Sequence, residues 1–329
     1  MDALDLLRLN LLSPMVLAFV LGLVAVWVKS DLKLPEQLYT VLSIYLLFAI
    51  GLKGGGELSI TSFAVLWKPM LATLVLGVSI PLVAYQILLR LGRLNVVDAA
   101  AIAAHYGSVS AVTFTAALSF AQAQNIELEG FMPALLALLE VPGIVVALLL
   151  ARASLNPNSS QTTHSSMGEV WRELFTGRSL FVLLGGLVIG WLSGKAGLEQ
   201  VKPFFVDPFK GALTLFLLEM GMVAASRLRD FLRVGGFLTA FAIIMPVING
   251  SLGVVLGHFA GLSVGGSFVL GAMAGSASYI AAPAAIRVAL PQANPAYYLG
   301  MSLGVTFPFN LSLGIPLYYA VATALGAPR

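Results

Sequence analysis

The chain has 329 residues, of which 59% are hydrophobic and 10% are charged. Soluble domains usually carry about 25% charged residues, so this composition excludes a water-exposed surface and points to a lipid environment. The formal net charge of +3 is small, and binding of nucleic acid is not expected. Because the chain has no cysteine and its three histidines lack ligand spacing, neither a cofactor nor a transition-metal centre is predicted.

Ten apolar segments are long enough to cross a bilayer core, which is about 30 Å thick and needs roughly 20 residues per helix. No small-residue cleavage site follows the first segment, so we expect it to be retained as a span. A polar stretch, 153–178, follows the fifth segment and is predicted to link two halves, 1–152 and 179–329. The ten predicted spans are 11–28, 36–56, 69–91, 97–122, 129–152, 179–196, 207–226, 235–260, 263–289 and 296–325.

The two halves resemble each other in sequence. Residues 107–118 align without gaps on residues 275–286, and Pro81 in the third span has a counterpart in Pro246 in the eighth. Five spans in each half force the halves into opposite orientations, as in many secondary transporters. The predicted fold is therefore an all-α integral membrane protein with ten transmembrane helices in two inverted five-helix repeats.

Lysine and arginine residues give the expected orientation. The loops on one side of the predicted membrane hold eleven of the 18, and the other side, termini included, holds seven. The positive-inside rule then places both termini outside and the 153–178 linker in the cytoplasm.

Small polar residues interrupt the fourth and ninth spans at corresponding places, and these two helices are predicted to be broken. A broken helix directs free N–H groups and the positive end of its dipole at an anion, while its free oxygens suit Na⁺. Each motif alone is also compatible with simple helix packing. Their occurrence in both repeats favours a binding site. The candidate substrate-binding residues are Gly107, Ser108, Ser110, Ala111, Thr113, Ser276, Ser278 and Tyr279.

Glu140 lies mid-span beside a proline that frees a backbone carbonyl. A carboxylate there ligates a cation, carries a proton or forms a structural hydrogen bond, and the sequence leaves these alternatives open. The corresponding region of the second repeat offers the neutral oxygens of Thr306 and Asn310. Together with Thr115, these residues form the candidate sodium site, with Na⁺ as the coupling ion.

Three other charged residues receive structural interpretations. Glu219 is expected to pair with Arg227 or Arg229 on the same helix. Asp98 is expected to stabilise the N-terminus of the fourth span. Arg287 closes the ninth span, where it either lies at the membrane boundary or contacts substrate. Because the chain lacks the H-E-x-x-H and phosphate-loop motifs, an enzyme is not expected.

At these residues the chain resembles the sodium-dependent bicarbonate transporter family, best known from cyanobacteria. The resemblance runs over nearly all ten spans. It implies a bacterial inner-membrane protein of ten spans that assembles as a homotrimer, with a core and a gate domain in each protomer. It also implies a PII-like regulatory trimer on the cytoplasmic side. The matching segments are 97–99, 107–111, 116–118, 220–222, 226–227, 263–266, 275–278, 283, 287, 291–295 and 314–317.

The resemblance implies substrate and sodium near the two breaks, with roles for Ser108, Ser110, Ser276 and Ser278. At Tyr279 the chain departs from the family, whose cyanobacterial members carry an aspartate there. An aspartate is an acceptor-only ligand, whereas a phenol both donates and accepts. Glu140 stands where the family's fifth span has what resembles an aspartate.

We therefore expect a sodium-coupled symporter of a small monovalent anion, with bicarbonate as the first candidate. Importing such an anion against an inside-negative potential costs about 2.3 kcal/mol per 100 mV, and one Na⁺ carried with it cancels that cost. The alternatives are an organic-anion or proton-coupled carrier on the same scaffold and, from another class, an anion channel or a sensor.

Overall fold

The computed structural model describes residues 3–154, 166–231 and 235–326, and every regular element in these residues is a helix. The prediction of an all-α, multi-pass protein is confirmed at this level. In the described part of the chain, eight helical stretches are long and apolar enough to cross a membrane, and two apolar helices, α2 (Pro14–Trp27) and α13 (Val264–Ala274), are shorter. The eight are Gln37–Leu58, Phe63–Arg90, Val96–Ala123, Met132–Ser154, Arg178–Phe205, Phe209–Leu228, Gly236–Phe259 and Pro295–Gly326.

The first predicted span, 11–28, is shorter in the structure. Helix α2 (Pro14–Trp27) has 14 residues, because Ser13 caps its N-terminus and accepts a hydrogen bond from the Val16 N–H at 3.3 Å. A separate helix, α1 (Ala3–Leu11), precedes it. The other helices of the first half are α3 (Glu36–Leu58), α4 (Phe63–Arg90), α5 (Val96–Gly107), α6 (Ala111–Ala123), α7 (Met132–Glu140) and α8 (Pro142–Ser154).

The predicted span 179–196 is longer in the structure. Helix α10 (Arg178–Phe205) bends at Gly194, whose φ of 63° lies in the left-handed region that favours glycine, and then continues. The last predicted span contains two π-helical turns. The remaining elements are α11 (Phe209–Phe231), α12 (Gly236–Phe259), α13 (Val264–Ala274), α14 (Ala281–Ala289), α15 (Pro295–Leu299), η1 (Gly300–Thr306), α16 (Phe307–Phe309), η2 (Asn310–Gly314) and α17 (Ile315–Gly326).

Two helices are interrupted where small polar residues predict it. Residues 108–110 separate α5 from α6, and residues 275–280 separate α13 from α14. The fifth predicted span is also divided, because α7 ends at Glu140 and α8 begins at Pro142, which lacks the N–H needed to continue the helical hydrogen bonds.

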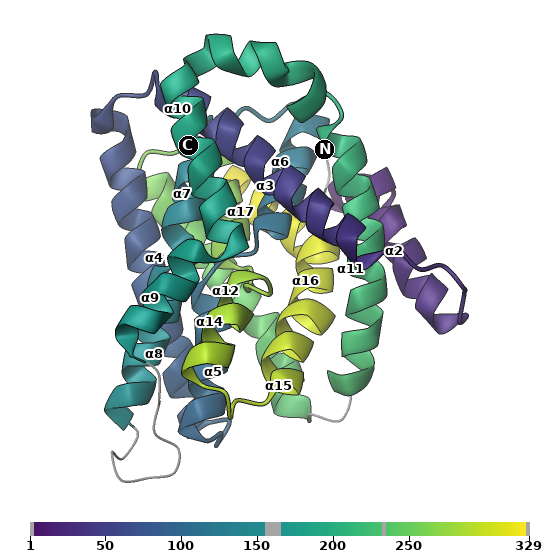
Figure 1. Cartoon of the computed structure of the whole chain (residues 1–329), viewed down its shortest axis with the longest axis vertical. Coiled ribbons are helices and arrows are strands. Elements are labelled where there is room, and N and C mark those ends of the chain that lie inside the picture. Colours follow the sequence, from purple (N-terminus) through teal and green to yellow (C-terminus); the bar gives the residue numbers. More distant parts are fainter. Residues whose placement is uncertain (1–2, 155–165, 232–234, 327–329) are drawn as a thin grey trace.

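Helices α2 and α11 pack side by side at one edge of the molecule, and α3 packs along α10 (Figure 1). Glycines allow both close approaches. A Cβ on Gly22 would lie 3.0 Å from the Cα of Gly221, and one on Gly51 would lie 2.9 Å from the Cα of Gly186. In lipid, small residues of this kind let helix backbones pack closely. Helices α4, α5 and α8 pack together, as do α12, α13 and α17.

The linker between the halves ends in a helix. Of the predicted linker 153–178, residues 155–165 lie outside the described part of the chain. Helix α9 (Met167–Thr176) begins with a capping box, in which Ser166 and Glu169 exchange hydrogen bonds between side chain and backbone. Its buried residues include Val170 and Leu174, and it packs against α14 and α10. The linker is therefore in contact with one of the interrupted helices.

Candidate functional site

The two interruptions cross each other in the interior of the protein. The Ser110 N–H donates to the Ser276 hydroxyl at 2.9 Å, and the Ser278 N–H donates to the His105 carbonyl at 2.8 Å. Ser276 in turn donates to the carbonyl of Met273. The structure therefore brings the two predicted serine runs into direct contact, although they lie far apart in the sequence.

Serine side chains bind the backbone at the start of each half-helix that leaves the crossing. The Ser110 hydroxyl accepts from the Thr113 N–H at 3.1 Å, and the Ser278 hydroxyl accepts from the Ala282 N–H at 3.2 Å. Helix α6 has 13 residues and α14 has nine. Both helices therefore place the positive ends of their dipoles beside the crossing, an arrangement that favours a small anion.

The other predicted substrate residues surround the crossing. Ser108 donates to the carbonyl of Glu140 at 2.8 Å, while Gly107 lies against Gly143. The buried hydroxyl of Thr113 has no hydrogen-bond partner among the described residues. The buried phenol of Tyr279 lies beside the Ser110 hydroxyl but makes no hydrogen bond of normal geometry within the described structure.

The predicted sodium ligands fall into separate hydrogen-bond groups. Glu140 is 4% exposed, and its carboxylate accepts from the hydroxyl of Ser179 at the start of α10. Asn310 donates to the Gly275 carbonyl at 2.8 Å, so it contacts the second interruption directly. No hydrogen bond within the described ranges joins Glu140 to Asn310, and a shared sodium site stays a prediction.

The other two predicted sodium ligands, Thr115 and Thr306, form hydrogen bonds with other partners than Glu140 and Asn310 do. Thr115 donates to the Ala111 carbonyl one turn back on α6. The Thr306 hydroxyl donates to the Ala242 carbonyl at 2.7 Å and also bonds the phenol of Tyr106. These two contacts attach the π-helical turn η1 to α12 and α5.

Asp98 links two elements. It lies in the first turn of α5, whose cap is Asn95, and its carboxylate accepts from the Asn294 N–H at 2.7 Å and from the Asn95 side chain at 2.7 Å. The start of α5 is therefore attached to the connection before α15.

The expected pairing of Glu219 with Arg227 is wrong, since no ion pair joins them. Eight residues along a helix separate their Cα atoms by about 12 Å, too far for direct contact. The Arg229 side chain lies outside the described residues.

Three cavities follow one another past the crossing. The largest, about 510 Å³, is lined by Tyr279, Ile280, Pro283 and Arg287, among others. A cavity of about 10 Å³ comes next and shares Ile280 with it, and one of about 320 Å³ shares Ile50 with the small cavity. The middle cavity is at the lower limit for one water molecule, so an apolar constriction separates two wide ends.

The wall opposite the crossing was missed by the sequence analysis. The constriction is lined from α3 and α11 by Ser43, Leu46, Leu47, Ile50 and Phe216. Tyr39 and Ser43 both line the large cavity and lie four residues apart, on one face of α3. In the sequence, two polar residues four positions apart in an apolar helix were the feature from which this wall was predictable.

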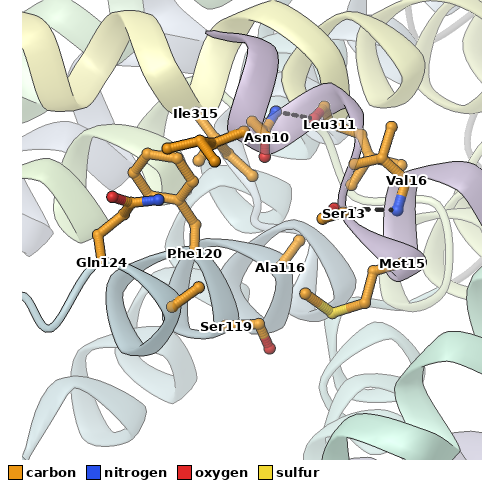
Figure 2. Close-up of a pocket in the computed structure, with 12 residues that line it drawn as sticks. Asn10, Ser13, Met15, Val16, Ala116, Ser119, Phe120, Gln124, Leu311 and Ile315 are labelled. Atoms are coloured by element: carbon orange, nitrogen blue, oxygen red, sulfur yellow. Dashed lines mark hydrogen bonds between the residues drawn. The ribbon is translucent and has the colours of Figure 1, made fainter. Parts of the chain in front are cut away.

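A small cavity of about 30 Å³ between α1, α6 and η2 has a structural role (Figure 2). The Asn10 amide donates to the carbonyls of Leu311 and Ser312, at 2.8 and 3.0 Å. Pro316 has no N–H with which to bond the Ser312 carbonyl four residues earlier. Asn10 therefore satisfies carbonyls at the break in the last span.

One family model matches most of the chain. The model is described as the Na⁺-dependent bicarbonate transporter superfamily, and it matches residues 14–323, from the start of α2 almost to the end of α17. Both interruptions, the crossing and the three successive cavities fall within the matched range. A search of curated proteins finds no match.

Proposed function

We propose that this chain, which belongs to the Na⁺-dependent bicarbonate transporter superfamily, carries a small monovalent anion inward together with Na⁺. Its family membership makes the protein a transporter and not an enzyme. Bicarbonate is the first candidate substrate. The observation that carries the proposal is the crossing of Ser108–Ser110 and Gly275–Ile280, where two half-helix N-termini meet beside an apolar constriction. Such an arrangement suits an anion that passes between two wide cavities.

The proposed architecture is two inverted repeats of five spans, 1–152 and 179–329. Paired helix contacts support it, since the packing of α2 on α11 has a counterpart in α3 on α10. The hydrogen bonds at the starts of the interrupted helices also have counterparts in the two halves. Asp98 binds Asn294 in the connection after α14, and Glu129, in the connection after α6, accepts from the Ser263 N–H at 2.6 Å.

In this proposal the first, second, sixth and seventh spans form a gate, and the other six form a core that moves against it. The anion binds among the serines of the crossing, close to Tyr279. Na⁺ takes oxygen ligands from Thr115, Glu140, Thr306 and Asn310. Glu140 is the one carboxylate of this set, and its contact with Ser179 joins the core to the gate.

We propose a homotrimer in a bacterial inner membrane with both termini outside. Contacts between α1 and α17 support placing the two ends of the chain on one side (Figure 1). A PII-like regulator would act through the linker, since α9 packs against α14.

Uptake of radiolabelled bicarbonate into proteoliposomes, with and without a sodium gradient, tests the proposal. We expect gradient-dependent uptake that Ser276→Ala reduces roughly tenfold, because the buried Ser110 N–H loses its acceptor at a cost of about 1–3 kcal/mol. Ser302→Ala is the matched control, since Ser302 is buried but bonds the carbonyl of Tyr298 within its own helix turn. Sodium-independent flux, or no flux, would contradict the symport proposal.

Tyr279→Asp is expected to change the sodium stoichiometry. A carboxylate at the crossing supplies an anionic ligand for a second Na⁺, and transport of two Na⁺ with one anion moves net positive charge. Uptake by the variant should rise under an inside-negative potassium diffusion potential, whereas wild-type uptake should not respond. Tyr279→Phe is the control, since it removes a phenol without a hydrogen-bond partner and should leave the melting temperature unchanged. A potential-insensitive Tyr279→Asp variant that folds would refute this assignment.

A further inference from the structure

The largest of the three successive cavities carries an unusual set of charges. Its lining includes Arg178 from α10, Arg227 from α11, Arg287 from α14 and one carboxylate, Glu219. Three guanidinium groups and one carboxylate give a formal charge of +2. We call this cavity of about 510 Å³ the arginine vestibule.

None of the three guanidinium groups is neutralised by a described partner. Ion pairs join Lys195 to Glu57, at 3.5 Å, and Lys202 to Glu199, at 3.4 Å, and both lie outside this cavity. The charges occupy two regions of the vestibule. Arg178 and Glu219 lie near the Tyr39 phenol, while Arg227 and Arg287 lie near the phenol of Tyr298. The Asp98 carboxylate also lies near Tyr298, where it accepts from the Asn294 N–H.

Two buried polar atoms of the vestibule also lack partners. The Tyr279 hydroxyl and Glu219 Oε2 have no hydrogen-bond partner within the described residues, although both are inaccessible to solvent. Most buried polar groups in folded proteins are hydrogen-bonded, so the wall of the vestibule holds two unsatisfied groups. Because both atoms are closed to solvent, the three guanidinium groups are the ones on which a ligand depends.

The size of the vestibule does not match a single small anion. Sites for metabolite-sized ligands span about 300–1,000 Å³, whereas bicarbonate has four heavy atoms. Arginine binds carboxylate and phosphate groups in bidentate geometry, and a net charge of +2 favours a ligand with at least two negative charges.

We propose that the arginine vestibule binds a soluble multivalent oxyanion of metabolite size, bearing several carboxylate or phosphate groups, and that this ligand inhibits transport. Tyr279 and Ile280 line the vestibule, and Ile280 also lines the constriction. A ligand held there blocks the wide end of the path and keeps α14 from moving. The inference goes beyond the symport proposal, because it concerns a ligand that is not transported.

Calorimetric titration of the purified full-length protein with inorganic pyrophosphate, without sodium or bicarbonate, tests the binding. The double substitution Arg227→Gln and Arg287→Gln should raise the Kd about 100-fold, with roughly tenfold for each lost bidentate contact. Glu219→Gln should lower the Kd several-fold, because it removes the negative charge of the vestibule. Arg172→Gln on α9, whose side chain is outside the vestibule, is the control and should leave the Kd unchanged.

The opposite signs expected for the arginine and Glu219 variants exclude a general loss of structure, and melting temperatures without ligand check that each variant is folded. Equal Kd values in wild-type protein and the double variant would overturn the proposal. Nitrate that binds as tightly as pyrophosphate would overturn it too, since the arginines would then only attract monovalent substrate. Binding that is seen only with anionic phospholipid vesicles, and not with soluble pyrophosphate, would also overturn the proposal.

Pyrophosphate enclosed in proteoliposomes, with the vestibule facing inward, should slow uptake at least fivefold. Undiminished uptake at saturating pyrophosphate would refute the inhibitory role. Because binding is measured without transport, its failure leaves the symport proposal intact, and failure of symport leaves the binding result intact.

Discussion

Gly143→Val is expected to prevent the protein from folding. A Cβ at this position would lie 2.6 Å from the Cα of Gly107 and closer still to its carbonyl group. Gly107 cannot retreat, because a Cβ there would itself lie 2.8 Å from the ring of Pro81. Helices α8 and α5 therefore meet through backbone atoms directly before the first interruption, and α5 in turn lies against the Pro81 ring of α4. Overpacking in cores usually costs 1–3 kcal/mol, and a clash with a backbone that the Pro81 ring keeps from moving should cost more than about 3 kcal/mol.

Proteins usually have a free energy of unfolding of about 5–15 kcal/mol, so a loss of more than about 3 kcal/mol is a large part of the total. The measurement is the yield of monodisperse protein in mild detergent, together with its melting temperature. Gly185→Val on α10 is the control, since nothing lies within 4 Å of a Cβ at that position. We expect wild-type yield from the control. A Gly143→Val protein that melts like the wild type would show that α5 and α8 are not packed as described.

Asn310→Leu is expected to lower stability by about 2–6 kcal/mol and to abolish uptake. The Asn310 side chain donates to the Gly275 carbonyl and accepts from the Tyr318 hydroxyl, each at 2.8 Å. Leucine removes one of the bonds that hold the second interruption in place and leaves the Gly275 carbonyl unsatisfied, at about 1–3 kcal/mol for each lost partner. Tyr318 keeps its bond to the Pro246 carbonyl, at 3.0 Å, which moderates the loss.

Asn249→Leu is the matched control for this substitution. Asn249 is also buried in an apolar helix, but its amide nitrogen has no partner among the residues that the structure describes. Replacement of an unpartnered amide by leucine should be neutral or stabilising. Thermal unfolding in detergent and sodium-driven uptake check both variants. An Asn310→Leu protein as stable and active as Asn249→Leu would remove Asn310 from the site.

Several features of this protein follow from the sequence alone. The apolar composition and the roughly 20-residue segments predict a multi-pass helical protein, because a backbone in lipid must satisfy its own hydrogen bonds within each segment. The Gly-Ser runs predict both interruptions, since local residues decide where a helix breaks. The family match over residues 14–323 agrees with the predicted resemblance.

The lengths of the helices and the pairing of charged side chains were less predictable from the sequence. The first span is divided by the Ser13 cap, and α10 runs nine residues beyond its predicted end at 196. Glu219 does not pair with Arg227, because the helix itself separates them. A window of hydropathy detects neither a cap inside an apolar run nor the direction of a side chain.

The residues themselves therefore determined the membrane environment, the helical class and the two interruptions, which are local properties of composition and backbone chemistry. Only the tertiary structure decided that the Ser110 N–H meets the Ser276 hydroxyl, and that three arginines from α10, α11 and α14 line one cavity. These contacts join residues distant in sequence. They depend on which helix faces pack together, and glycines such as Gly143 and Gly107 set the distance at which they do so.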